Sequence, residues 1–197
     1  MSKTAKTVAL VLVVITMLGV GVVSWGVGAY NSLVGLDEGV NNSWAQVENV
    51  LQRRSDLIPN LVNTVEASMK QEQDIFIAIA ESRQSLKNAN NAQEASDANN
   101  ELNSNLNTLV SVIHESYPEL ASNQNIQELM AQLEGTENRI SVERKRYNDD
   151  VTVFNTKIRQ MPLNIIAGVL NFEQKDLFEM SEGAEVVPDV QINVGGN

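Results

Sequence analysis

The sequence predicts an all-α protein: an N-terminal transmembrane helix, an antiparallel up-and-down four-helix bundle, a short C-terminal helix and an extended tail. Three observations lead to this fold class. An uncharged apolar run covers residues 8–30, and apolar residues recur at spacings of three and four after it. Only four prolines and eleven glycines interrupt the 197 residues, and aromatic residues, which favour strands, make up 5% of them.

The apolar run at residues 8–30 is long enough to cross a bilayer. At about 1.5 Å per residue it spans about 34 Å, which exceeds a hydrocarbon core of about 30 Å. Trp25 and Tyr30 stand at its downstream end, where amphipathic rings favour the membrane interface. A cleaved signal peptide is the alternative, but its apolar core is usually only about 7–15 residues long. We therefore expect a retained anchor that contacts the lipid bilayer.

Two lysines predict the orientation of this anchor. Lys3 and Lys6 precede the apolar run, and no Lys or Arg follows it until Arg53. The positive-inside rule then places the N-terminus in the cytoplasm and the bundle on the extracytoplasmic side of a single-pass membrane protein.

Small residues recur every four positions along the end of the anchor, at Ser24, Gly28 and Ser32. Such a stripe lets two membrane helices approach closely, so a homo-oligomer through this helix is one interpretation. The other, which we favour, is that glycine and serine are common in membrane helices.

Prolines and composition divide the rest of the chain into four expected helices. Their lengths of about 40, 43, 36 and 57 Å are compatible with up-down-up-down packing. An Asn- and Ala-rich stretch at 87–100 is expected to hold a loop. The expected helices cover residues 31–57, 60–88, 93–116 and 124–161. The domain boundaries are then a short tail at 1–7, the anchor at 8–30, the bundle at 31–180 and a second tail at 181–197.

The stretch LQRRSDLIPNLV, residues 51–62, predicts a turn or sharp kink between the first two helices. Pro59 removes a backbone donor and disfavours the helical conformation in the residue before it. Arg53 and Arg54 would then lie in the last turn of one helix, where cations suit the dipole. Asp56 would cap the next helix, which is expected to begin at Asn60, by accepting backbone N–H groups at its start.

Apolar residues repeat every seven positions in the fourth expected helix and predict a coiled-coil-like seam. Glu137 and Arg144 stand in the companion row of that seam. One interpretation is a buried ionic layer in which Arg53, Arg54 or Asp56 supplies a partner. The other is that both residues lie in water at the edge of the seam. The repeat consists of Ile126, Leu133, Ile140, Tyr147, Phe154 and Met161.

Two segments follow the fourth helix. LNIIAGVLNF, residues 163–172, forms a broad apolar face on a short helix, which either covers the open end of the bundle or rests in the membrane interface. We favour the first interpretation. Val190, Ile192 and Val194 alternate as in a short strand, which either joins a sheet edge on another protein or is a loose terminus.

Composition argues against several kinds of chemistry. The net charge of −11 opposes binding to nucleic acid, whose backbone is anionic. Without cysteine, and with His114 as the sole histidine, a zinc or copper site is not expected. Neither a G-x-S-x-G nucleophile turn nor a phosphate-binding loop is found. We therefore predict no catalytic residue, no metal and no cofactor.

Two quoted segments carry a resemblance to a known family. YNSLVGLDEGVNNSWAQVENVLQRRSDLIPNLVNTV, from Tyr30, and RYNDDVTVFNTKIRQMPLNIIAGVLNF, to Phe172, resemble the LemA family. The resemblance implies an N-terminal membrane helix, an antiparallel four-helix bundle and no established enzymatic activity. It also implies a role in bacterial membrane organisation, including magnetosome biogenesis in one branch, often with a cytoplasmic bundle. The matching residues are Arg53, Arg54, Asp56, Leu57, Pro59, Asn60, Tyr147, Asn148, Asn155 and Pro162.

From these observations we expect an interaction or scaffolding module in the bacterial inner membrane, with a protein partner of unknown identity. The alternative is an envelope hydrolase, or an accessory subunit of one, with its site at the Arg53, Arg54 and Asp56 end of the bundle.

Overall fold

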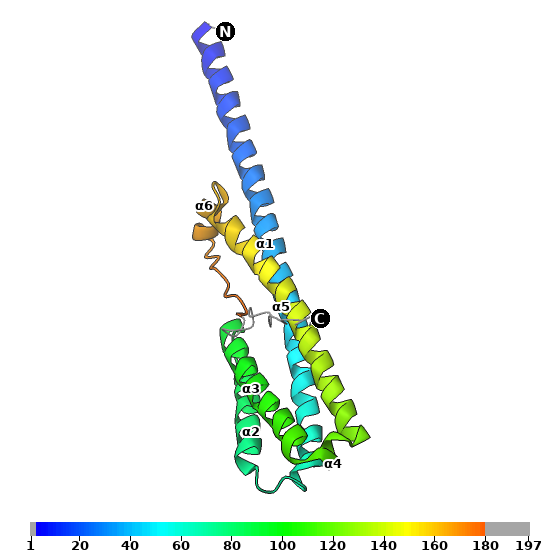
Figure 1. The fold of residues 1–197 in the computed structure, drawn as a ribbon. Coiled ribbons are helices and arrows are strands. Elements are labelled where there is room, and N and C mark those ends of the chain that lie inside the picture. Colours follow the sequence, from blue (N-terminus) through cyan, green and yellow to red (C-terminus); the bar gives the residue numbers. More distant parts are fainter. Residues whose placement is uncertain (1–2, 180–197) are drawn as a thin grey trace, which may run out of the picture. The chain divides into compact units, whose positions relative to one another are not determined.

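The computed structural model describes residues 3–179, which form six α-helices and no strand (Figure 1). The predicted all-α fold, with a long apolar N-terminal helix followed by a helical bundle, is confirmed. The predicted tail at 181–197, with its strand at 190–194, lies outside the described residues. The helices are α1 (Lys3–Glu66), α2 (Gln73–Asn88), α3 (Ala92–Ser116), α4 (Pro118–Ala121), α5 (Gln124–Arg159) and α6 (Leu163–Val169).

The chain divides into two compact units, and each is described by itself. Among the described residues, the first unit contains 3–47 and 143–175, and the second contains 48–142 and 176–179. Both α1 and α5 therefore contribute to each unit.

The first unit begins with the apolar part of α1. This is the one helix among the described residues that is long and apolar enough to cross a membrane. Its large apolar side chains from Leu10 to Val27 are exposed. Beyond them, Leu33, Val40 and Val47 are buried at intervals of seven residues. The anchor and the first amphipathic segment are thus one continuous helix.

The seam of α5 is confirmed over most of its predicted length. Every member of the heptad row from Ile126 to Phe154 is buried. Met161 is the exception, because α5 ends at Arg159 and Met161 lies beyond the helix, 73% exposed. Pro162, joined to Met161 by a cis peptide bond, directly precedes α6, so the predicted stop at this proline is confirmed.

The second unit contains four helical segments: the end of α1, α2, α3 and the start of α5, with α4 between the last two (Figure 1). Only residues 89–91 lie outside a helix in the Asn- and Ala-rich stretch where a loop was expected. Asn91 ends this loop by accepting a hydrogen bond from the Glu94 N–H at 2.8 Å. The following alanines Ala92, Ala95 and Ala98 form a buried face of α3.

The predicted turn at Pro59 is wrong, because α1 continues through this proline and the chain turns at residues 67–72 instead. Pro59 has no N–H for the carbonyl of Ser55, four residues earlier. The Nε–H of Arg83 in α2 donates to that carbonyl at 2.7 Å. A tertiary contact therefore replaces the missing helical hydrogen bond. The buried row Leu51, Ile58, Leu61 and Val65 continues on both sides of the proline.

Candidate functional site

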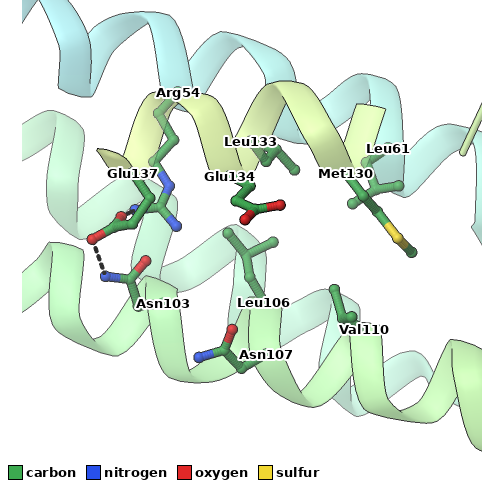
Figure 2. Close-up of a pocket in the computed structure, with 10 residues that line it drawn as sticks. All are labelled: Arg54, Leu61, Asn103, Leu106, Asn107, Val110, Met130, Leu133, Glu134 and Glu137. Atoms are coloured by element: carbon green, nitrogen blue, oxygen red, sulfur yellow. Dashed lines mark hydrogen bonds and ion pairs between the residues drawn. The ribbon is translucent and has the colours of Figure 1, made fainter. Parts of the chain in front are cut away.

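A cleft of about 510 Å³ opens in the second unit between α1, α3 and α5 (Figure 2). Its lining is divided by polarity. Figure 2 shows Arg54, Glu137 and Asn103 at one end, and Leu61, Val110 and Met130 at the other. Between the two ends lie the remaining lining residues, which are Leu106, Asn107, Leu133 and Glu134.

An ion pair between α1 and α5 forms the polar end. Arg54 Nη1 donates a hydrogen bond to Glu137 Oε2, and it also donates to Asn99 Oδ1 at 3.1 Å. The other oxygen of Glu137 accepts from Asn103 Nδ2 at 3.3 Å (Figure 2). The Glu137 carboxylate thus links α5 to both α1 and α3.

Burial sets the electrostatics of this pair. The residue Arg54 is 4% exposed, whereas the Glu137 side chain is 38% exposed. Loss of hydration lowers the pKa of Arg54, and the facing Glu137 carboxylate opposes that change. The guanidinium nevertheless stays charged, because arginine is not deprotonated in proteins. Arg54 Nε is also buried and makes no hydrogen bond within the described part of the chain.

The chemistry of the cleft suits recognition. Its side chains supply a guanidinium, carboxylates, amides and apolar surface, a combination that can bind a partner with both polar and apolar groups. Within residues 3–179, no group of three or more His, Cys, Asp or Glu side chains could hold a metal ion.

The chain matches the family model of LemA over residues 43–192. It belongs to the LemA family. The resemblance stated from the RRSDLIPNLV and YN segments is thereby confirmed. No curated protein matches the chain. LemA is not known as an enzyme family.

The LemA residues around Pro59 do not converge on one site. Arg54 lines the cleft, but Arg53, Asp56 and Asn60 are exposed and are not among its lining residues. The predicted capping role of Asp56 is wrong, because Asp56 lies inside α1 and accepts from Gln52 Nε2 at 2.8 Å.

The two charged seam residues have different surroundings. Glu137 pairs with Arg54, one of the three partners that the seam predicted. This pair is neither fully buried nor fully in water, since the arginine is enclosed and the carboxylate is partly exposed. Arg144 is half-buried on α5 in the first unit. The functional roles of Glu137 and Arg144 remain predictions.

The second LemA segment lies in the first unit. Tyr147 is buried, and its ring packs on Trp44 of α1 with centroids 5.2 Å apart. Asn148 is half-buried beside it. Asn155 holds the backbone of Lys175 with two hydrogen bonds, donating to its carbonyl at 2.8 Å and accepting from its N–H at 2.9 Å. This clamp attaches the segment after α6 to α5.

The two aromatic residues expected at the membrane interface differ in their contacts. Trp25 is 47% exposed among other exposed apolar side chains of α1. Tyr30 packs on Phe172, the residue that follows α6 closely in the chain, with ring centroids 6.4 Å apart.

Three polar residues of the second unit are absent from the sequence-based candidates. Asn99 and Asn103 bind the ion pair, and Arg83 binds the carbonyl that Pro59 leaves open. The Asn-rich composition of 87–100 suggested a loop and obscured Asn99. The spacing of four between the two asparagines, in line with buried Leu102 and Leu106, is the signal that could have found them.

Proposed function

We propose that this LemA family protein is a single-pass, membrane-anchored helical bundle that acts as an interaction or scaffolding module in the bacterial envelope. The observation that supports the proposal is the two-part composition of α1. This one helix contains an apolar segment whose side chains are exposed, and then a row of buried residues that belongs to the bundle. A helix with both parts holds its bundle close to the membrane.

The cleft at the Arg54–Glu137 pair is the surface that we assign to a protein partner. Its apolar end offers half-exposed Val110 and Met130, and exposed Glu134 lies between the two ends. This combination favours a partner that presents an apolar side chain next to a cationic one.

We further propose that the anchor lies in the cytoplasmic membrane, with the bundle on its extracytoplasmic side. The support is the position of Lys3 and Lys6 upstream of the apolar run.

Side-specific labelling of single cysteines in intact cells tests the anchor and its orientation. The chain has no cysteine of its own, so Ser2→Cys and Ser122→Cys each create a unique thiol. We expect an impermeant maleimide to label only position 122, which is exposed at the end of α4. Labelling of position 2 alone would place the bundle in the cytoplasm. Recovery of the chain in the soluble fraction would contradict the anchor.

Cross-linking in cells tests the role of the cleft. A photo-reactive residue replaces Asn107, which lines the cleft and is exposed, and the control replaces Gln84, an exposed residue of α2 outside the cleft. We expect a discrete adduct from position 107 that is absent from position 84. Equal adduct patterns at both positions would contradict a specific docking role for the cleft.

The hydrolase alternative requires Arg53, Arg54 and Asp56 to form one site. The structure separates them, with Arg54 buried in an ion pair and the other two exposed outside the cleft. No observation favours that alternative, and we do not propose it.

A further inference from the structure

The segment around α6 exposes large apolar side chains. Met161 is 73% exposed, Ile165 59%, Val169 79% and Leu170 46%, whereas Ala167 is the buried residue of α6. The favoured expectation, that this helix covers the end of the bundle, is therefore not met by Ile165, Val169 and Leu170, whereas Leu163, Ile166 and Phe172 are half-buried. A cluster of four exposed apolar residues within ten positions needs a physical reason.

The contacts of α6 within the first unit suggest why its apolar side chains are exposed. Phe172 donates its N–H to the carbonyl of Ala167 at 2.9 Å, which ties it to α6. Its ring then contacts Tyr30 of α1, with centroids 6.4 Å apart. Tyr30 is the last residue of the apolar run, so α6 is linked to α1 at the place where that run ends (Figure 1).

Two further contacts hold this arrangement in place. The ring of Phe172 also packs edge-on against Phe154 of α5, at 6.2 Å. Lys175, clamped by Asn155, forms an ion pair with Asp37 of α1 at 3.0 Å. Contacts with both α1 and α5 therefore hold the segment that presents the apolar surface of α6.

The distribution of acidic and basic residues also distinguishes the segment around α6 from the rest of the bundle. No Asp or Glu occurs between Asp150 and Glu173, and outside residues 1–36 this is the longest stretch without acidic residues in the chain. The exposed basic residues Lys157 and Arg159 lie in the last turn of α5, directly before it. Residues 151–172 thus carry no carboxylate in a protein of net charge −11. On α1, the carboxylate beside Leu170 and Phe172 is that of Asp37, which is paired with Lys175, and Glu173 follows the stretch without acidic residues. Anionic lipid headgroups would attract Lys157 and Arg159 at this place.

We propose that α6, with the flanking Met161 and Leu170, inserts its apolar side chains into the headgroup region of the bilayer that α1 spans. This second, interfacial contact rests on the proposed function, because it requires α1 to be the membrane anchor. Short apolar faces next to basic residues bind at the boundary between headgroups and acyl chains. The occupant of the surface is then lipid, and the bundle is held against the membrane at two places.

Depth-dependent fluorescence quenching tests this proposal on the full chain in phosphatidylethanolamine–phosphatidylglycerol vesicles. An environment-sensitive dye is attached to one cysteine at a time, in Val20→Cys, Val169→Cys and Ser141→Cys. Val20 reports on the anchor and Val169 on α6, and Ser141 is an exposed control on α5. We expect lipids brominated near the headgroup to quench the dye at Val169. Aqueous iodide should quench that dye at least about threefold less than the dye at Ser141.

The readouts separate failure of this inference from failure of the anchor. If the dye at Val20 is quenched by lipid but the dye at Val169 behaves like that at Ser141, the anchor stands and the α6 contact is wrong. If the dye at Val20 is not quenched, the anchor fails and this inference fails with it. A dye at Val169 that is shielded from both iodide and lipid, and that self-quenches between copies, would show that a second chain covers α6 and would overturn the proposal.

A second variant tests whether the lipid contact comes from the apolar face of α6 rather than from the attached dye. Ile165→Asp adds a carboxylate to the apolar face at a position 59% exposed, where the fold tolerates it. In this background we expect the dye at Val169 to lose most of its quenching by lipid, with an unchanged circular dichroism spectrum. Unchanged lipid quenching would contradict insertion of this face.

Discussion

The contact between Arg83 and the Ser55 carbonyl makes a sharp prediction about Pro59. Arg83→Met keeps an apolar stem but removes the donor that reaches the Ser55 carbonyl oxygen at 2.7 Å. A hydrogen bond from a charged group contributes about 1.5–3 kcal/mol, and we take about 1.5 kcal/mol because Arg83 is only half-buried. In a chain of this size, that loss lowers the melting temperature by about 3–6 °C.

The Pro59→Ala background should weaken this effect. The alanine introduced there has an N–H that can reach the Ser55 carbonyl along the helix, so Arg83 is no longer the sole donor to that carbonyl. We expect Arg83→Met to cost only about 0.5 kcal/mol in this background, which leaves a coupling energy of about 1 kcal/mol in the double-mutant cycle.

Urea unfolding of the full chain in detergent micelles, followed by circular dichroism at 222 nm, measures all four members of the cycle. Arg139→Met is the matched control, because Arg139 is exposed on α5, and it should change stability by less than about 0.5 kcal/mol. Equal costs of Arg83→Met in the parent chain and in the Pro59→Ala background would refute the role we give to the arginine.

Three other predictions address the ion pair, the clamp and a helix cap. Glu137→Leu leaves Arg54 buried without its counter-charge and should lower the free energy of unfolding in urea by about 2 kcal/mol, less than the usual roughly 3–5 kcal/mol because the carboxylate is partly exposed. The double variant Glu137→Leu, Arg54→Met should lose less stability than Glu137→Leu alone, and a larger loss in the double variant would contradict this reasoning. Asn155→Ala removes both hydrogen bonds to Lys175 and should destabilise the segment by about 2 kcal/mol. Trypsin should then cleave after Lys175 faster than in the parent chain, and an unchanged rate would count against the clamp. The Glu94 carboxylate accepts a backbone N–H just before α3, which lowers its pKa. The ionised Glu94 therefore stabilises the fold above its unfolded pKa of about 4.3, and this stabilisation is lost as the pH falls through the lower folded pKa. Glu94→Gln should be less stable than the parent chain at pH 7, and the two stabilities should become equal in strong acid, as urea unfolding at several pH values would show.

Local patterns in the sequence were enough to predict most helices and their ends. The uncharged run at 8–30 predicts an apolar helix because its composition leaves no other way to satisfy its backbone in a bilayer. Pro118 and Pro162 end their helices for reasons that lie within a few residues, since each restricts the residue before it. The heptad row of α5 likewise follows from a spacing that is read directly from the chain.

Pro59 shows where such reading fails. Its chemistry is that of the other prolines, and from local rules it should also end a helix. Whether the helix continues depends on a donor for the Ser55 carbonyl, and Arg83 supplies it from 28 residues away. A sequence pattern cannot show that contact, because only packing of α2 on α1 brings the two groups together.

The pairing of the residues that line the cleft likewise depends on the tertiary structure. The sequence by itself marked Arg54 and Glu137 as charges that would need partners if they were buried. Their pairing across 83 positions, and the asparagine that binds Arg54 across 45, come from the tertiary structure. The physical reason is that burial makes an unpaired polar group costly, and which residues relieve that cost depends on the packing of helices distant in sequence.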